Sequence, residues 1–268
     1  MSDSLSAPQP AGLTGLSGRA LLRLVMPTLF AAVLLFFALK APGFLTVGNL
    51  SSLLLNNFVL LAIVAIGMTY AIAAGGIDLS VGTALDFSAL TFVLLLNAGF
   101  GLYVAIPGGL LAGSLAGLFN AGLIAGLRIS PFLATLGTLF IGSSVQKLLS
   151  DGGQPIYLEA QVRSGLASER LLGVPLPLLL VALLALVYGV VLARGRLGRE
   201  IIVLGSQPLV ARYSGLAQRR IAALVFIASA FASALAGILL PATVNAYAPM
   251  SGNAFLMNAI GAVFIGAT

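Results

Sequence analysis

Long apolar stretches follow one another along almost the whole chain, separated by short clusters of glycine, proline and charged residues. Between residues 41 and 127 the only charged side chains are Asp78 and Asp86, and residues 221–268 contain none. A helix needs roughly 20 mainly apolar residues to cross the hydrocarbon core of a bilayer. The pattern therefore predicts an all-α, polytopic transmembrane helical bundle.

Eight membrane spans are predicted in this chain. The first three cover residues 21–39, 50–74 and 80–97, and the fourth follows the turn residues Gly99, Gly101 and Pro107 and ends at residue 127. The fifth and sixth cover 131–149 and 171–193, and the last two begin at residues 221 and 254. The turn between these last two is indicated by Pro241, Asn245, Pro249 and Gly252. Residues 1–19 are polar and are expected to be a cytoplasmic tail. Residues 20–268 then form one membrane domain, in which small residues let the helices pack closely.

The amino-acid composition agrees with a membrane protein and excludes several kinds of catalytic and metal site. Of 268 residues, 60% are hydrophobic and 7% are charged, whereas soluble domains carry roughly 25% charged residues. There is no cysteine and no histidine, which excludes disulfides, thiol chemistry and the usual zinc sites. The sequence also lacks a phosphate-binding G-x-x-x-x-G-K-[ST] motif and an HExxH pair. We therefore disfavour a membrane enzyme and expect no cofactor or metal.

The basic residues predict orientation rather than a nucleic-acid partner, because they stand mainly at the ends of apolar segments. With a cytoplasmic N-terminus, nine of the thirteen basic residues lie inside: Arg19, Arg23, Arg128, Arg194, Arg196, Arg199, Arg212, Arg219 and Arg220. The polar segment 151–170 is then outside. Segment 194–220, which is the most basic part of the chain, is then cytoplasmic.

A polar break with one carboxylate interrupts the apolar pattern between the second and third spans. It reads GGIDLSVG and comprises Gly75, Gly76, Ile77, Asp78, Leu79, Ser80, Val81 and Gly82. One interpretation is structural: Asp78 and Ser80 cap the next helix, whose free N–H groups favour an anion. The other interpretation is that the break also lines a translocation route or its cytoplasmic gate.

Four more polar residues within the spans are candidates for the translocation path: Asn56, Asn57, Asp86 and Asn120. Asparagine can bind sugar hydroxyls, but in membranes it more often links one helix to another. For Asp86, proton coupling, substrate contact and a buried hydrogen bond are all open, and we favour a packed structural role.

Segment 194–220 is expected to contain a short helix within LVARYSG, with Pro208 in its first turn, Gly215 at its end and Arg212 exposed. It is either a solvated, topology-setting loop or a docking element for a cytosolic partner.

Five stretches, in this order, resemble one known family: GGIDLSVG (75–82), NAGLI (120–124) leading to PFLATLGTL (131–139), DGGQPI (151–156), LGREIIVLG with ARYSG (197–215), and GAVFIGAT (261–268). The chain thus resembles the membrane permeases of bacterial ABC importers for ribose and related sugars, which include the autoinducer-2 permeases. The resemblance extends over almost all the chain after Arg19.

The resemblance implies a ten-helix permease of the vitamin-B12-type importer fold in the bacterial inner membrane, forming the path for a sugar or sugar-like solute. It implies a homodimer, or a heterodimer with a second permease, with cytosolic ABC ATPase subunits and a periplasmic solute-binding protein as partners. It also implies that segment 194–220 couples to the ATPase, through Arg199, Gly205, Pro208, Leu209, Ala211, Arg212, Ser214 and Gly215.

Three features differ from the family pattern. Gly205, Ser206 and Gln207 stand where the family usually has Gly-Gly-Asn, Asp86 stands where a small or neutral residue is expected, and the chain ends in its eighth span. We therefore expect a partial or divergent chain. The alternative function is a self-contained secondary transporter or channel for a small polar solute, for which Asp86 is the only indication.

Overall fold

The computed structural model describes residues 18–159, 166 and 169–266. The chain divides into two compact units, residues 1–51 and 52–268. Most of the predicted cytoplasmic tail, and Arg163 and Ser164 of the polar segment 151–170, lie outside the described residues.

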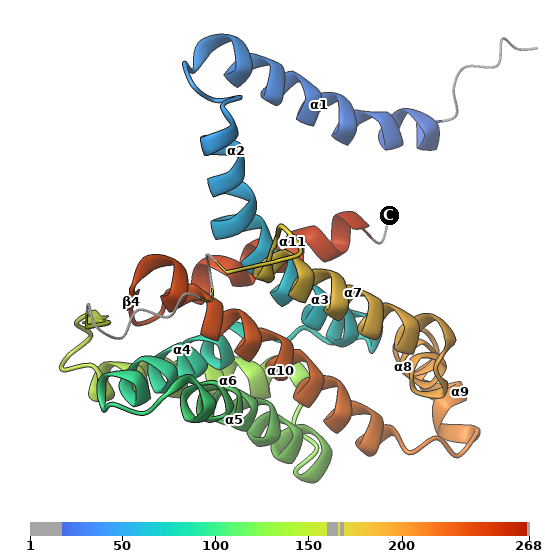
Figure 1. The fold of residues 1–268 in the computed structure, drawn as a ribbon. Helices are drawn as coiled ribbons and strands as arrows, with labels where there is room; N and C mark the ends of the chain where they lie inside the picture. The colour runs from blue at the N-terminus through green and yellow to red at the C-terminus, as the bar shows by residue number, and fades with distance from the viewer. Residues whose placement is uncertain (1–17, 160–165, 167–168, 267–268) are drawn as a thin grey trace, which may run out of the picture. The chain divides into compact units, whose positions relative to one another are not determined.

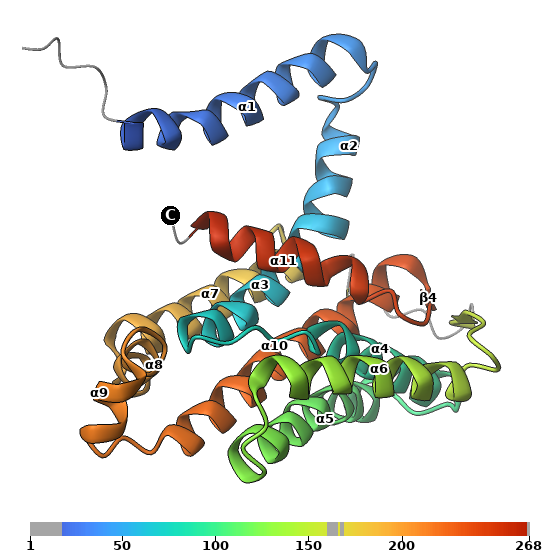
Figure 2. The same ribbon diagram turned by 180° about the vertical axis from the view of Figure 1, so that it is seen from behind.

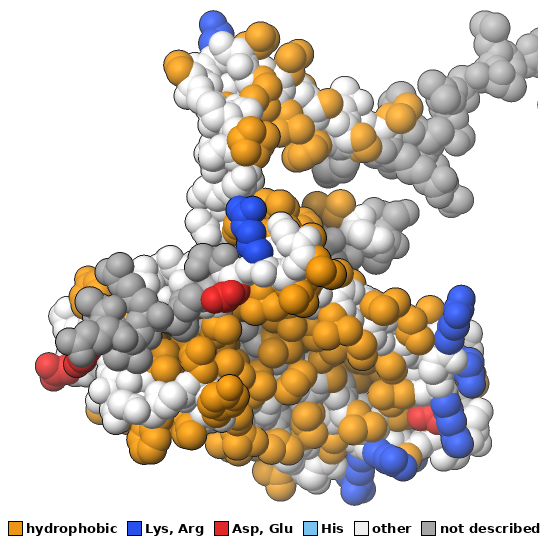
Figure 3. Space-filling model, viewed as in Figure 1, with side chains coloured by type: hydrophobic (Ala, Val, Ile, Leu, Met, Phe, Trp, Pro, Cys, Tyr) orange, Lys and Arg blue, Asp and Glu red, His pale blue; other side chains and the backbone are white. Residues whose placement is uncertain are grey.

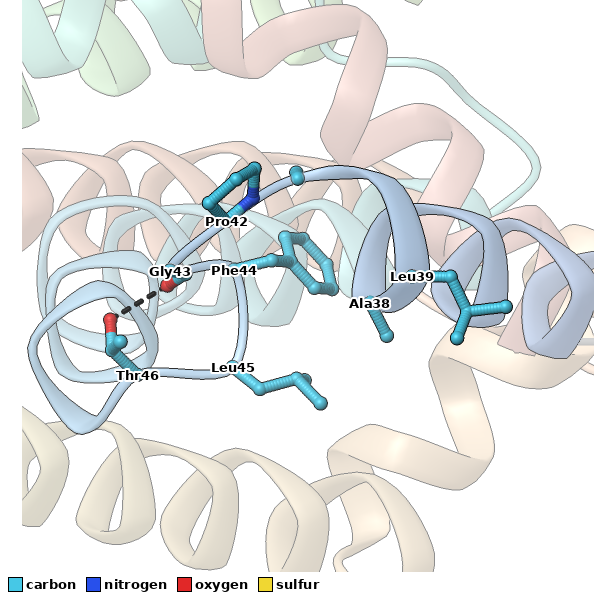
Figure 4. Close-up of a pocket in the computed structure, with 8 residues that line it drawn as sticks. Ala38, Leu39, Pro42, Gly43, Phe44, Leu45 and Thr46 are labelled. Atoms are coloured by element: carbon cyan, nitrogen blue, oxygen red, sulfur yellow. Dashed lines mark hydrogen bonds between the residues drawn. The ribbon is translucent and has the colours of Figure 1, made fainter.

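The first unit contains α1 (Gly18–Lys40) and most of α2 (Val47–Ser52) (Figure 1). The turn between them has Gly43 in the left-handed region (φ +84°) and forms a shallow hollow (Figure 4). Its polar groups bond to one another: the Thr46 hydroxyl donates to the Gly43 carbonyl (2.7 Å), and the Asn49 amide donates to the Phe44 carbonyl (2.7 Å). The hollow is therefore the surface of a turn whose polar groups are hydrogen-bonded to one another.

The second unit is built from helices with four two-residue strands (Figures 1 and 2). Its helices are the π-helix η1 (Leu53–Phe58), α3 (Val59–Ala73), α4 (Val81–Asn97), α5 (Leu102–Ala121), the π-helix η2 (Gly122–Gly126), α6 (Pro131–Leu149), α7 (Leu176–Arg194), α8 (Arg196–Ser206), α9 (Pro208–Tyr213), α10 (Gln218–Val244) and α11 (Asn253–Gly266). Strand β1 (Ile156–Tyr157) pairs with β4 (Ala246–Tyr247), and β2 (Arg170–Leu171) pairs with β3 (Val174–Pro175).

Helix α10 is the centre of this unit and packs against α3, α4 and α5. Small residues make these close contacts possible: a β-carbon on Gly117 of α5 would lie 2.7 Å from the Phe226 carbonyl oxygen of α10. Two tyrosines connect α7 to α3 and α10. The Tyr70 hydroxyl of α3 donates to the Tyr188 carbonyl of α7 (2.9 Å), and the Tyr188 hydroxyl donates to the Ala228 carbonyl of α10 (2.8 Å). The helices of this unit thus form one packed core.

The connections of the second unit gather in two sets. In one set, the β1–β4 pair joins the segment after α6 to the segment after α10, and the Asn97 amide at the end of α4 donates to the Tyr157 carbonyl (2.9 Å). In the other set, Gly76 packs on Pro131 and Gly75 packs on Gly205. Helices α4, α5 and α6 therefore each run from one set to the other.

The apolar helices agree with a multi-pass membrane protein. Five helical stretches of the described chain are long and apolar enough to span a bilayer: Val47–Ala73, Leu102–Gly126, Pro131–Leu149, Leu176–Arg194 and Gln218–Val244. Three shorter apolar helices, Pro27–Lys40, Val81–Asn97 and Asn253–Gly266, lie at the remaining predicted spans.

Several sequence-based boundaries were wrong. The sixth predicted span begins at Leu176, because residues 170–175 form a hairpin whose two turn residues, Leu172 and Gly173, both have positive φ, as a type I′ turn requires. Pro107 and Pro241 lie inside α5 and α10 and are not turns, since a proline removes one backbone hydrogen bond that a well-packed helix can lose. Helix α8 was not predicted at all.

Candidate functional site

The break between α3 and α4 begins with a glycine-dependent helix end. Gly75 has φ +80°, its amide donates to the Ile72 carbonyl (2.9 Å), and the Gly76 amide donates to the Ala71 carbonyl (2.9 Å). This pair of bonds around a left-handed residue is the Schellman motif, which ends a helix and satisfies its last carbonyls. The glycine at position 75 therefore fixes where α3 stops.

Asp78 organises the rest of the break. Its Oδ1 accepts hydrogen bonds from the Ser80 amide (2.9 Å) and the Ser80 hydroxyl (2.6 Å), and both residues are fully buried. Ser80 is the N-cap residue of α4, but its side chain makes no bond to the helix, so the predicted capping role of its hydroxyl was wrong. The hydroxyl instead donates to the carboxylate, and Asp78 holds the entry to α4 through the Ser80 amide.

Two further side chains extend this arrangement into the bundle. The Asn120 amide donates to Ser80 Oγ (2.6 Å), and the Thr138 hydroxyl donates to Asn120 Oδ1 (2.5 Å). We call Asp78, Ser80, Asn120 and Thr138 the Asp78 network; none is more than 4% exposed. The network ties the break to α5 and α6, and Asn120 therefore links one helix to another.

One edge of the Asp78 network is incompletely paired. Asp78 Oδ2 and the hydroxyl of Ser229 on α10 are buried and have no hydrogen-bond partner within the described residues. Buried polar atoms without a partner are uncommon in folded proteins. The Asp78 network therefore leaves one buried carboxylate oxygen without a partner among the described residues.

Asp86 lies two turns into α4 and holds the loop between α10 and α11. Its Oδ1 accepts hydrogen bonds from the Gly252 amide (2.9 Å) and the Ser251 hydroxyl (3.2 Å). Gln146 of α6 holds the same loop, because its Oε1 accepts the Met250 amide (2.7 Å) and the Tyr247 hydroxyl (3.2 Å). Of the three roles that the sequence left open for Asp86, the geometry shows a buried hydrogen-bonding one.

Glycine at position 82 serves the same loop. A β-carbon there would lie 2.9 Å from the carbonyl carbon of Gly252 and 3.0 Å from the Asn253 side chain. The first turn of α4 thus packs backbone to backbone against the residues that enter α11, which explains why the last position of GGIDLSVG is a glycine.

The basic segment 194–220 runs from the end of α7 through α8 and α9 to the first residues of α10. The short helix predicted from Pro208 is α9, and Gly215 has a positive φ (+71°) just after it. Ala211 is buried, whereas Leu209 is 68% and Tyr213 is 87% exposed and Arg212 is also exposed. Figure 3 shows arginine side chains gathered at the end of the molecule that carries α8 and α9. This end presents apolar, aromatic and basic groups together.

The predicted residues of this segment divide between its parts. Arg199 and Gly205 lie on α8, Pro208, Leu209, Ala211 and Arg212 lie on α9, and Ser214 and Gly215 follow it. Gly205 touches the break: a β-carbon on Gly75 would lie 3.1 Å from Gly205 Cα. The structure therefore brings the predicted coupling segment and the GGIDLSVG break into contact.

Asn56 and Asn57 lie apart from these groups, on the π-helix η1 that precedes α3. Both are exposed, and the Asn56 amide donates to Ser52 Oγ (3.1 Å). A π-turn inside a helix frequently occurs at a functional site. These amides lie within the apolar stretch Val47–Ala73, where contact with lipid would leave them without hydrogen-bond partners. They are therefore expected to face protein or water.

The sequence reasoning missed Thr138, Gln146 and Ser229. Thr138 stands inside the PFLATLGTL motif and Gln146 is the only amide side chain in an apolar span, so the sequence marked both residues. Ser229 is one of two serines in α10, and no pattern in the sequence marked it. Among the described residues, no three His, Cys, Asp or Glu side chains are placed to hold a metal ion.

Comparison with known proteins covers most of the chain. The family model described as branched-chain amino acid transport system / permease component matches residues 50–268. The autoinducer 2 import system permease protein LsrD of Yersinia pseudotuberculosis (serotype O:3, strain YPIII) is 33% identical over 253 residues, which cover 91% of this chain and 74% of the relative.

Other relatives agree. The LsrD protein of Yersinia enterocolitica (serotype O:8 / biotype 1B) is 34% identical over 221 residues, which cover 79% of this chain and 65% of the relative. That of Yersinia pestis (strain Pestoides F) is 32% identical over 253 residues, which cover 91% and 74%. No solved structure matches the chain.

Proposed function

This chain belongs to the family of branched-chain amino acid transport system permease components, and from that membership we propose that it is the membrane-spanning subunit of an ABC importer for a sugar-like solute. The observation that carries the proposal is the similarity to autoinducer 2 import permeases over 91% of this chain. The family description names amino acids, so the choice of a sugar-like solute rests on these relatives and on the motifs quoted above.

The energy for import is proposed to come from separate cytosolic ATPase subunits. The sequence has no phosphate-binding loop of its own, so ATP hydrolysis that drives import would take place on another protein in contact with this one. Helix α9 supports such a contact, because Leu209 and Tyr213 are mostly exposed beside Arg212 at the basic end of the molecule. An exposed aromatic and an arginine are the residue types enriched where protein interfaces are strongest.

The proposed orientation places α8, α9 and the N-terminus in the cytoplasm and the β1–β4 pair in the periplasm. The arginines of segment 194–220 support it, because short cytoplasmic loops carry an excess of basic residues. A periplasmic solute-binding protein would then deliver solute on the β1–β4 side. The complete permease is proposed to have ten spans of the vitamin-B12-type importer fold and to pair with a second permease copy or subunit.

Asn56 and Asn57 are proposed to face the translocation path. They are exposed amides within the apolar stretch Val47–Ala73, and amide groups suit the hydroxyls of a sugar-like solute. Asp86 and Asn120, the other two predicted path residues, are fully buried and hydrogen-bonded within the bundle, which favours a structural role for them.

The coupling role is tested by changing the exposed surface of α9. Leu209→Glu should abolish co-purification with the cognate ATPase subunit, because it places a charge in an apolar contact, whereas the permease should still insert and pair. Gly215→Val should act similarly by disturbing the left-handed residue after α9. Gly99→Val is the matched control, since Gly99 has nearly the same φ (+84°) in the set of turns that contains Tyr157.

Uptake in membrane vesicles completes the test. The proposal predicts that Leu209→Glu loses ATP-driven uptake of autoinducer 2, the solute named for the relatives. Uptake that needs no ATPase subunit, or that survives loss of its binding, would contradict the proposal and favour a self-contained transporter.

A further inference from the structure

Gly205 is in close contact with the α3–α4 break. A β-carbon on Gly205 would overlap the Ala73 carbonyl oxygen and would lie 2.8 Å from the Gly75 nitrogen and 2.9 Å from the Ala74 carbonyl carbon. Since real β-carbons essentially never approach to such distances, the end of α8 and the end of α3 meet backbone to backbone. A movement of either segment toward the other therefore displaces its neighbour.

On the α8 side, the contact lies next to the surface proposed to bind the ATPase. Only Ser206 and Gln207 separate Gly205 from α9. The other end of α8 is anchored on α7, because a β-carbon on Gly198 would overlap the Leu192 carbonyl oxygen. A force on α9 therefore acts at the C-terminal end of α8, which is the end that touches the break.

On the break side, the contact lies next to the Asp78 network. Gly76 packs on α6, where a β-carbon would lie 3.2 Å from Pro131 Cβ, and the Thr135 hydroxyl lies 3.3 Å from the Ile77 carbonyl oxygen that it can donate to. Asp78 follows Ile77 directly, and its carboxylate is the first member of the chain of hydrogen bonds that reaches α5 and α6. A displacement of exposed Gly75 can thus pass through the half-buried Gly76 and Ile77 to the buried Asp78 network.

We infer that Gly75 and Gly205 form the contact through which movement of α9 is transmitted to the α3–α4 break and from there to the Asp78 network. The inference rests on the proposed function, because it needs a partner that moves α9. It assigns a positioning role to both glycines: neither touches solute, and both serve to keep two backbones in direct contact. Such packed, hydrogen-bonded segments are the elements that carry coupling between distant sites.

The test uses hydrogen–deuterium exchange of the natural, full-length permease in complex with its cognate ATPase subunits, with and without a non-hydrolysable ATP analogue. We expect protection of residues 208–213 when the ATPase binds. When the nucleotide binds, the amides of residues 74–80 should change their exchange rate by about fivefold or more, the lower end of ordinary allosteric coupling. The turn at Gly99, in the set of turns that contains Tyr157, should not change.

Two matched pairs of variants follow. Gly205→Ala should abolish the nucleotide response of residues 74–80 while 208–213 stay protected; Gly137→Ala, on a helix with open space, should not. Gly75→Ala and Gly99→Ala share a strained positive φ, but only Gly75 touches α8, so only Gly75→Ala should abolish the response. Backbone strain at a positive φ therefore cannot by itself explain a lost nucleotide response in Gly75→Ala.

The outcomes separate the two proposals. No protection of residues 208–213 in the wild-type complex would overturn the ATPase contact itself. Protection there with an unchanged segment 74–80, or a normal response in Gly205→Ala, would overturn the Gly75–Gly205 transmission alone. Because the first arm uses the wild-type protein, a variant that fails to fold does not weaken the test.

Discussion

Removing the side chain of Asn120 is the most direct perturbation of the Asp78 network. Asn120→Ala deletes the donor to Ser80 Oγ (2.6 Å) and the acceptor of the Thr138 hydroxyl. Thr138 keeps a second acceptor, the Ala134 carbonyl (3.1 Å), and the Ser80 hydroxyl keeps its bond to Asp78 Oδ1 (2.6 Å), so the variant loses the two bonds that Asn120 makes between helices. A typical hydrogen bond contributes about 0.5–1.5 kcal/mol net, and hydrogen bonds between membrane helices average roughly 0.6 kcal/mol.

We therefore expect Asn120→Ala to lower the free energy of unfolding by about 1–2 kcal/mol. For a chain of this size that corresponds to a fall in Tm of about 2–8 °C, measured by thermal unfolding in detergent. Thr138→Val should cost a similar amount, because it leaves Asn120 Oδ1 without its donor. The double variant should cost less than the sum, because the two residues share one bond.

Thr69→Val is the control for this experiment. The Thr69 hydroxyl donates only to the Ala65 carbonyl of its own helix (2.8 Å), so its loss should change stability by less than about 0.5 kcal/mol. Strictly additive effects of Asn120→Ala and Thr138→Val, or an Asn120→Ala variant no less stable than Thr69→Val, would refute the reasoning that the network holds α5 and α6 to the break.

Three further predictions concern single positions. Asp78→Asn should retain most of the folded yield, because asparagine still offers Oδ1 to the Ser80 amide, whereas Asp78→Leu should lower it by removing roughly 1 kcal/mol; equal yields in size-exclusion chromatography would reject this role. Asp86→Leu should make the loop of residues 245–252 sensitive to protease in detergent, because leucine cannot accept the Gly252 amide, whereas Asp86→Asn should not. Protease resistance of both variants would contradict the role of Asp86 in holding this loop. A cysteine at Ser206 should be labelled only from the cytoplasm and one at Ser164, outside the described residues, only from the periplasm; the reverse pattern would contradict the orientation.

The sequence predicted the helices well because their apolar lengths are set by the bilayer. The span over residues 131–149 has the predicted limits, and the short helix from Pro208 and the left-handed Gly215 follow from local backbone preferences. Helix α8 was missed since its residues are basic and polar on one side, so they resemble a loop when apolar length is the only signal.

The partners of the buried polar residues were not predictable in the same way. Asp78 and Ser80 are neighbours in sequence, but their link to Asn120 and Thr138 depends on how α5 and α6 pack, which no local pattern specifies. The contact of Gly75 with Gly205 is also separated by 130 residues of chain and marked only by two glycines among 32. Motifs therefore indicated which residues matter, and the three-dimensional packing showed what each one touches.

The measurement that tests the central claim most directly is solute uptake by the natural, full-length permease in proteoliposomes. The vesicles would contain the cognate ATPase subunits and solute-binding protein, with labelled autoinducer 2 and ribose as probes. An ATP-driven importer predicts uptake of at least one probe that requires ATP, the ATPase subunits and an unchanged Leu209 surface on α9. Uptake of equal rate without ATP or without the ATPase subunits would contradict the claim.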